Sequence, residues 1–302
     1  MVGVLAVTAI LVGVGLTSRA DETPDAQAPD RDGYFRTELA GSWESLPSGE
    51  ECARRVHRSA WEPRPSNDRA NHTRPDPAAV HASMTSRPRG NGISYADRFN
   101  TWLLPRVDGQ HTGTTDENIQ WAACKWGISD NVLRAMAAAE STWYQGLQDD
   151  EGRCVEKRGC GDSVEQASAA TRTFCEHISG FGYDYQQDYG VGRCPKTFSI
   201  IGVMAWQDPE WGRMSHNQNG TFPFSRDSTA FALDYAAAHL RGCMEGWIVW
   251  LSSRDGFRRG DVWGCVGTWY AGDWKVPAAR EYAARVRSLM DERFWLRSDF
   301  NE

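Results

Sequence analysis

The sequence lacks the cysteine and histidine motifs that mark common metal sites. Its eight cysteines include no Cys-x-x-Cys pair, and its seven histidines include no His-Glu-x-x-His motif or other close pair. We therefore expect neither a metal nor a cofactor. An even number of cysteines in an exported chain instead predicts four disulfides, whose pairing stays open. The cysteines are Cys52, Cys124, Cys154, Cys160, Cys175, Cys194, Cys243 and Cys265.

Long apolar runs are also missing after residue 16. Residues 2–16 are apolar or glycine apart from Thr8, and Ser18 and Ala20 then form a small-x-small cleavage pattern. This arrangement predicts a signal peptide over residues 1–20. No Lys or Arg precedes the run, so an uncleaved anchor is the alternative, although about 15 apolar residues fall short of the roughly 20 that a membrane span needs. We expect a secreted or cell-envelope protein without further membrane contact.

The chain has no excess of positive charge. Its formal net charge is −7 at pH 7, and removal of residues 1–20 takes away only Arg19 and makes the chain more negative. Nucleic acid needs a basic binding face, so it is excluded as an expected partner. Hydrophobic residues make up 40% and charged residues 24%, as in soluble globular proteins. We expect a monomer.

The first hundred residues have few regular patterns. Residues 21–32 are acidic and contain proline with few large apolar side chains, which predicts a disordered spacer. Residues 33–111 contain isolated tryptophans, and five prolines between Pro63 and Pro88 exclude a long helix. We predict an irregular N-terminal extension over 33–111 that Cys52 fastens to the rest of the chain.

From residue 112 onward, helical patterns follow one another without alternating strands or internal repeats. A loop rich in glycine and tyrosine is predicted over 180–192, and Asp227 is predicted to cap a helix that Gly242 ends. The predicted helices cover 115–125, 129–143, 163–179, 227–240 and 277–294. The expected fold class is therefore mainly α, with residues 112–302 forming one domain around a deep cleft.

Glu140 lies near the end of the predicted helix 129–143. The residues three, four and seven positions before it are Ala137, Met136 and Leu133, so Glu140 shares the apolar face of the helix. Burial and the negative end of the helix dipole both raise the pKa of a carboxyl group. Such an acid keeps its proton near neutral pH and can deliver it to a glycosidic oxygen. The alternative is a glutamate that faces solvent or pairs with Arg134.

Three segments resemble motifs of soluble lytic transglycosylases and goose-type lysozymes, in the right order over about residues 112–292. The first combines residues 121–128, Trp-Ala-Ala-Cys-Lys-Trp-Gly-Ile, with the helix end Ala-Ala-Glu-Ser-Thr-Trp over 138–143. Glu140 and Ser141 match the catalytic glutamate and the serine that follows it in this family.

The other two segments match with substitutions. Gly202-Val203-Met204 corresponds to the start of a Gly-Leu-Met-Gln motif, but the next residue is Ala205 and the glutamine, Gln207, arrives two positions late. Residues 268–272, Thr-Trp-Tyr-Ala-Gly, correspond to Ala-Tyr-Asn-x-Gly. Trp269 and Tyr270 replace the tyrosine and the asparagine of that motif. Tyr282 resembles a late tyrosine that points at the catalytic carboxylate.

The resemblance implies a lysozyme-like fold and cleavage of the β-1,4 bond between N-acetylmuramic acid and N-acetylglucosamine in peptidoglycan glycan strands. Glu140 would act first as acid and then as base on the sugar's own 6-hydroxyl, which closes a 1,6-anhydro ring. The implied substrate-binding residues are Ser141, Met204, Trp206, Gln207, Trp269, Tyr270 and Tyr282. Fourteen tryptophans also suit a sugar cleft, although Trp247 and Trp250 are expected to pack inside.

A second carboxylate, which glycoside hydrolysis normally requires, is not assigned by the sequence. Three alternatives therefore stay open: a muramidase, a chitinase-type hydrolase, and a non-catalytic glycan-binding envelope protein with the same fold. The candidates for the second carboxylate are Asp149, Asp150, Asp184, Asp188 and Asp227.

Overall fold

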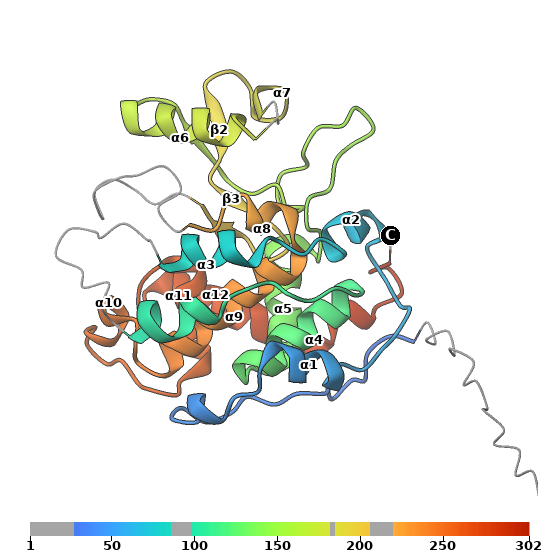
Figure 1. Cartoon of the computed structure of the whole chain (residues 1–302), viewed down its shortest axis with the longest axis vertical. Coiled ribbons are helices and arrows are strands. Elements are labelled where there is room, and N and C mark those ends of the chain that lie inside the picture. Colours follow the sequence, from blue (N-terminus) through green and yellow to red (C-terminus); the bar gives the residue numbers. More distant parts are fainter. Residues whose placement is uncertain (1–26, 86–97, 182–184, 206–219, 302) are drawn as a thin grey trace, which may run out of the picture.

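The computed structural model describes residues 27–85, 98–181, 185–205 and 220–301. This part of the chain is mainly helical, which confirms the predicted mainly-α composition of the fold (Figure 1). None of its helices has the length and apolar character needed to cross a membrane. The predicted signal peptide over 1–20 lies outside the described residues.

The described elements comprise helices of 4 to 16 residues, short helical turns and four very short strands. The helices are α1 Gly49–Arg55, α2 Asp68–Asn71, α3 Pro77–Thr85, α4 Thr115–Trp126, α5 Asp130–Ser141, α6 Ala169–Ser179, α7 Tyr185–Tyr189, α8 Phe224–Asp227, α9 Thr229–Met244, α10 Val249–Ser252, α11 Val262–Ala271 and α12 Pro277–Glu292. The turns are η1 Trp43–Ser45, η2 Pro65–Asn67, η3 Phe99–Leu103, η4 Leu104–Arg106 and η6 Phe294–Leu296. The strands are β1 Ser163–Glu165, β2 Arg193–Pro195, β3 Thr197–Phe198 and β4 Val203–Met204.

The helices α4, α5 and α9 form the centre of the helical body, and α12 packs against α5 and α11 (Figure 1). Every side chain of α4 is buried. This helix begins with a capping box, in which the Thr114 side chain accepts from the Glu117 N–H and the Glu117 carboxylate accepts from the Thr114 N–H. It ends at Gly127, whose φ of +56° is the left-handed conformation that glycine adopts without strain. Local sequence therefore sets both ends of the central helix.

Buried charges join neighbouring helices of this body. Asp234 of α9 accepts a hydrogen bond of 2.8 Å from Lys125 of α4 and another from the backbone N–H of Asp108. Arg134 of α5 donates to the carboxylates of Asp116 and Asp130. A buried charge is tolerated only when it is paired and hydrogen-bonded, so these contacts fix how the helices sit against each other.

The predicted N-terminal extension, residues 33–111, contains short helices and contributes to the main core. Cys52 of α1 forms a disulfide with Cys124 of α4, as the expected fastening through Cys52 requires. Val80 and Met84 of α3 are buried in the same core as α4, α5 and α9. The spacer predicted over 21–32 is described only from residue 27 onward, and there the carbonyl of Arg31 accepts a hydrogen bond from Asn131 of α5.

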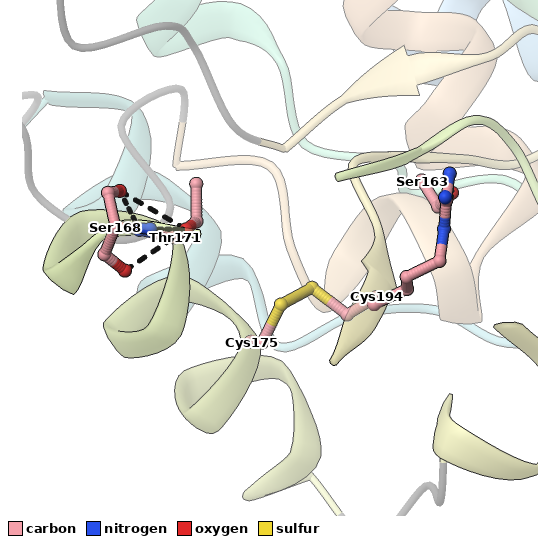
Figure 2. Close-up of a disulfide and its surroundings, with 6 residues drawn as sticks. Ser163, Ser168, Thr171, Cys175 and Cys194 are labelled. Carbon is pink, nitrogen blue, oxygen red and sulfur yellow. Dashed lines mark hydrogen bonds between the residues drawn. A yellow bond between two sulfur atoms is a disulfide. The ribbon is translucent and has the colours of Figure 1, made fainter. Parts of the chain in front are cut away.

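The helix predicted over 163–179 is wrong in its first part. Residues Ser163–Glu165 form β1, and α6 begins after Ser168. The hydroxyl groups and backbone N–H groups of Ser168 and Thr171 form a capping box there (Figure 2). This serine, rather than Ser163, therefore gives the helix its start, because it satisfies N–H groups that have no partner inside the helix.

The predicted role of Asp227 as a helix cap is also wrong. Asp227 ends α8 and pairs with Arg226, whereas Ser228 caps α9 by accepting from the Phe231 N–H. The helix continues past Gly242 to Met244. A side chain at position 242 would place its Cβ 2.5 Å from the Phe99 ring, so Gly242 serves close packing and does not end the helix.

The segment between α5 and α8 has a small core of its own and projects from the helical body (Figure 1). Strand β1 pairs antiparallel with β2, with Val164 opposite Cys194. The Cys175–Cys194 disulfide joins α6 to β2 (Figure 2). The remaining bridges are Cys154–Cys160 and Cys243–Cys265, so the prediction of four disulfides is confirmed. Strand β3 pairs antiparallel with β4, and this hairpin lies where the projecting segment joins the body (Figure 1).

Candidate active site

The end of α5 is held in place by contacts from several directions. Thr142 adopts the left-handed conformation at φ 56°, and the N–H of Trp143 donates to the Ala137 carbonyl, which closes the last turn. Arg64 and Asn67 of the extension donate to the carbonyl groups of Thr142 and Trp143 respectively. The extension therefore fixes the turn that follows Glu140.

Glu140 is half-buried at this helix end. The Tyr282 hydroxyl of α12 donates a hydrogen bond to Oε1 of Glu140. Burial in the surrounding protein raises the pKa of Glu140 to about 7. The Tyr282 hydrogen bond and the positive charge of Arg285 oppose this rise in pKa, whereas the negative charge of Asp162 adds to it. The carboxyl group therefore holds its proton at slightly acidic pH and is about half protonated near pH 7.

Gly202 lies close to the other oxygen of the same carboxyl group. It has a φ of +65°, and a Cβ atom at this position would lie 2.9 Å from Oε2 of Glu140. Both its conformation and the close approach require glycine. The first residue of the second predicted motif thus lies against the predicted acid, on the turn between β3 and β4.

Ser141 is buried and contacts this same turn. Its hydroxyl donates to the Ile200 carbonyl at 2.8 Å. Gln145 supports the turn as well, because its side-chain oxygen accepts from the Ile200 N–H and its amide donates to the Ser225 carbonyl. Ser141 is therefore placed to position the β3–β4 turn beside Glu140 and not to face a ligand. Gln145, which lies just past the family-like helix end, was missed by the sequence.

Aromatic side chains of α11 lie close to the Tyr282 ring and to the β3–β4 turn. Tyr270 stacks on Tyr282, with ring centroids 5.0 Å apart and planes within 5°. Tyr282 is buried, whereas Tyr270 is 62% exposed. Trp269 donates from its indole N–H to the Ile201 carbonyl and so joins α11 to the β3–β4 turn. The third predicted motif thus contains Tyr270, whose ring is exposed, and Trp269, whose ring binds the β3–β4 turn.

Met204 is 41% exposed and follows Gly202 by two residues. Trp206 and Gln207, the other predicted binding residues of this segment, lie outside the described residues. The structure therefore gathers Glu140, Ser141, Trp269, Tyr270 and Tyr282 at one place, and it sets Met204 on the adjacent strand β4.

Most candidates for a second carboxylate have structural contacts. Asp149 accepts from the N–H groups of its own loop and pairs with Arg153. Asp188 accepts from the Cys154 N–H at 2.7 Å, and Asp227 pairs with Arg226 as described above. Asp150 is exposed on the same loop as Asp149, and Asp184 lies outside the described residues. None of the four described candidates is among the groups that shift the pKa of Glu140.

Asp162, which the sequence did not single out, is the carboxylate whose charge reaches Glu140. Its backbone N–H donates to the Thr197 hydroxyl at 2.9 Å, and its carbonyl accepts from the Lys196 N–H at 2.7 Å. Gly161 lies so close to Thr197 that a Cβ there would come within 1.8 Å of the hydroxyl oxygen. Asp162 is exposed, and this contact with β3 fixes its backbone relative to the β3–β4 turn that covers Glu140.

Two cavities occur elsewhere on the described part of the molecule. One of about 490 Å³ is lined by residues that include Trp43, Arg106 and Asp108, and one of about 530 Å³ by residues that include Glu62 and His72. Neither is lined by Glu140. The described residues contain no group of three or more His, Cys, Asp or Glu side chains able to hold a metal.

In comparisons with known proteins, no family model, no curated protein and no solved structure matched this chain.

Proposed function

We propose that this protein is a lysozyme-like enzyme that cleaves peptidoglycan glycan strands, with Glu140 as its acid. One observation carries the proposal: a carboxyl group at the end of a buried helix has its pKa raised to about 7 and accepts a hydrogen bond from Tyr282, on which the exposed ring of Tyr270 stacks. An acid with a pKa near the working pH is suited to proton transfer. The four disulfides are compatible with a secreted or cell-envelope location.

The two oxygens of Glu140 would have different tasks. Because Tyr282 donates to Oε1, that oxygen acts as an acceptor and the proton resides on Oε2. From Oε2 the proton passes to the glycosidic oxygen, and the bond to the leaving sugar breaks. The exposed face of Tyr270 provides a flat apolar surface on which a sugar ring can stack. Ser141 and Gln145 keep the β3–β4 turn, with Gly202, against the acid.

A transglycosylase would complete the reaction without a water. After the glycosidic bond breaks, the Glu140 carboxylate takes a proton from the 6-hydroxyl of the N-acetylmuramic acid that has lost the leaving sugar. The oxygen of this hydroxyl then bonds to C1 of the same N-acetylmuramic acid. Because both reacting groups belong to one sugar, the effective concentration of the hydroxyl is high. A single carboxylate is sufficient for both proton transfers.

Hydrolysis is the second candidate function. It is favoured by Asp162, because the negative charge of this residue acts on Glu140. A carboxylate near the acid can remove a proton from an attacking water, which leaves a reducing sugar end. A non-catalytic binding protein is a weaker candidate. A carboxyl with a raised pKa destabilises the folded protein once it ionises, and it gives a binder no advantage.

Purified peptidoglycan digested with the protein should yield fragments that end in 1,6-anhydro-N-acetylmuramic acid. Such ends are lighter than a reducing end by one water and are unchanged by borohydride. Mass spectrometry before and after borohydride treatment distinguishes the two outcomes. Release of reducible ends only would contradict the transglycosylase mechanism, and absence of soluble fragments would contradict the enzyme proposal.

The variant Asp162→Asn separates the two chemistries further. In a transglycosylase, it should retain anhydro products and lose less than about tenfold in rate, since Asp162 then acts only through its charge. In a hydrolase, the rate of Asp162→Asn should fall by at least about 10²-fold, as expected for removal of a general base. Asp149→Asn is the matched control, because Asp149 is an aspartate of the preceding loop that pairs with Arg153.

A further inference from the structure

Arg285 lies one helical turn after Tyr282 on α12, the helix that packs against α5 and α11. Residues three positions apart are neighbours on one side of a helix. Arg285 is exposed, whereas Tyr282 is buried against Glu140. The positive charge of Arg285 lowers the pKa of both Glu140 and Tyr282. An exposed cation one turn from Tyr282 therefore acts electrostatically on the proposed acid.

The other arginines of α12 have contacts within the protein. Arg287 lies over the Trp263 ring, with its guanidinium carbon 4.4 Å from the ring centroid. Arg280 donates to the Lys275 carbonyl. Among the ion pairs of the described residues, none includes Arg285. In a chain with a net charge of −7, an exposed cation beside the acid is available to an anionic ligand.

We propose that Arg285 is a specificity residue that binds a carboxylate on the sugar next to the cleaved bond. This inference rests on the proposed function and deepens it. Muramic acid carries a lactyl group, which ends in a carboxylate when the stem peptide is absent, whereas chitin has no charged substituent. A guanidinium matches a carboxylate with two parallel hydrogen bonds. Arg285 thus favours anionic glycans, and Tyr270 provides a surface that accepts anionic and neutral sugars equally.

Two glycans of equal length provide the test. One is a peptidoglycan strand freed of stem peptides, with its lactyl carboxylates exposed, and the other is a chitooligosaccharide. For Arg285→Gln, kcat/KM on the anionic strand should fall about ten- to hundredfold, the range for loss of a hydrogen bond to a charged group. On the chitooligosaccharide it should change less than about twofold, as expected without a lost contact. Each variant is compared at its own optimum pH, because Arg285 also acts on the pKa of Glu140.

Binding of both glycans to Glu140→Gln, with and without Arg285→Gln, is measured by calorimetry and does not depend on turnover. The anionic strand should bind more weakly without Arg285, and this difference should shrink as salt is added. Arg287→Gln is the matched control and should leave both affinities unchanged. Equal losses for the two glycans, in binding or in turnover, would overturn the role of Arg285. If neither glycan is cleaved but only the anionic strand binds more weakly, the proposed enzyme activity fails and the selectivity stands.

Discussion

Replacing Glu140 by glutamine should reduce the rate of peptidoglycan cleavage by at least about 10²-fold, the lower range for loss of a general acid. Glutamine keeps the size of the side chain and can still accept from the Tyr282 hydroxyl, but it has no acidic proton to donate. The rate is measured as release of soluble fragments from purified peptidoglycan. Near-normal cleavage by this variant would remove Glu140 from the mechanism.

The same variant should fold at least as stably as the unmodified protein. The folded-state pKa of Glu140 is raised from about 4.5 to about 7. A raised carboxyl pKa means that the folded state binds the proton more tightly, so stability declines as the pH rises from 4.5 through 7. Glutamine does not ionise and avoids this decline. The melting temperature of Glu140→Gln should therefore equal that of the unmodified protein at pH 4 and exceed it at pH 8. A lower melting temperature at both pH values would indicate that lost activity reflects misfolding.

Removing the Cys52–Cys124 disulfide should cause the largest loss of stability among the four bridges. These cysteines are 72 residues apart, whereas Cys154 and Cys160 are only 6 apart. In the chain-entropy model, closing the longer loop stabilises the fold by about 4 kcal/mol and closing the shorter one by about 2 kcal/mol. Urea unfolding of the two double alanine variants measures the difference directly.

The variant without the Cys52–Cys124 bridge should also cleave peptidoglycan more slowly than the unmodified protein. The bridge holds the extension whose Arg64 and Asn67 donate to the turn after Glu140. The Cys154–Cys160 variant retains those contacts and is the matched control for them. Equal losses of unfolding free energy in the two double variants would contradict the assignment of the extension as an integral part of the folded domain.

The parts of the site that lie on one helix could be predicted from the sequence. Leu133, Met136 and Ala137 precede Glu140 at helical spacing, and this pattern alone predicts that Glu140 lies on an apolar helix face. The Tyr282 contact was expected from the resemblance, and the hydrogen bond to Glu140 is present. The packing of Trp247 and Trp250 was expected from their spacing, and both lie in or against the main core.

The parts that depend on contacts distant in sequence could not be predicted. Arg64 is 78 residues from Thr142, and no local pattern connects a proline-rich segment with a helix end. Asp162 lies in a loop two residues after Cys160. An aspartate in a loop is usually solvated and does not indicate a functional site. Its proximity to Glu140 depends on the pairing of its loop with β3, which only the folded chain establishes. The helix α11 was likewise expected only as a short motif, since Gly264 and Gly267 weaken its helical pattern.

Measurement of the pKa of Glu140 is the most direct test of the proposal that Glu140 is the proton donor. Carbon-13 NMR of the glutamate side-chain carboxyl carbons follows each carboxyl through its titration, and the signal missing from Glu140→Gln identifies Glu140. We predict a midpoint near 7 in the unmodified protein. We also predict a higher midpoint in Tyr282→Phe, because that variant removes a hydrogen bond that stabilises the ionised form. A midpoint near 4.5, unaffected by Tyr282→Phe, would show an ordinary solvated carboxylate and would contradict Glu140 as the proton donor.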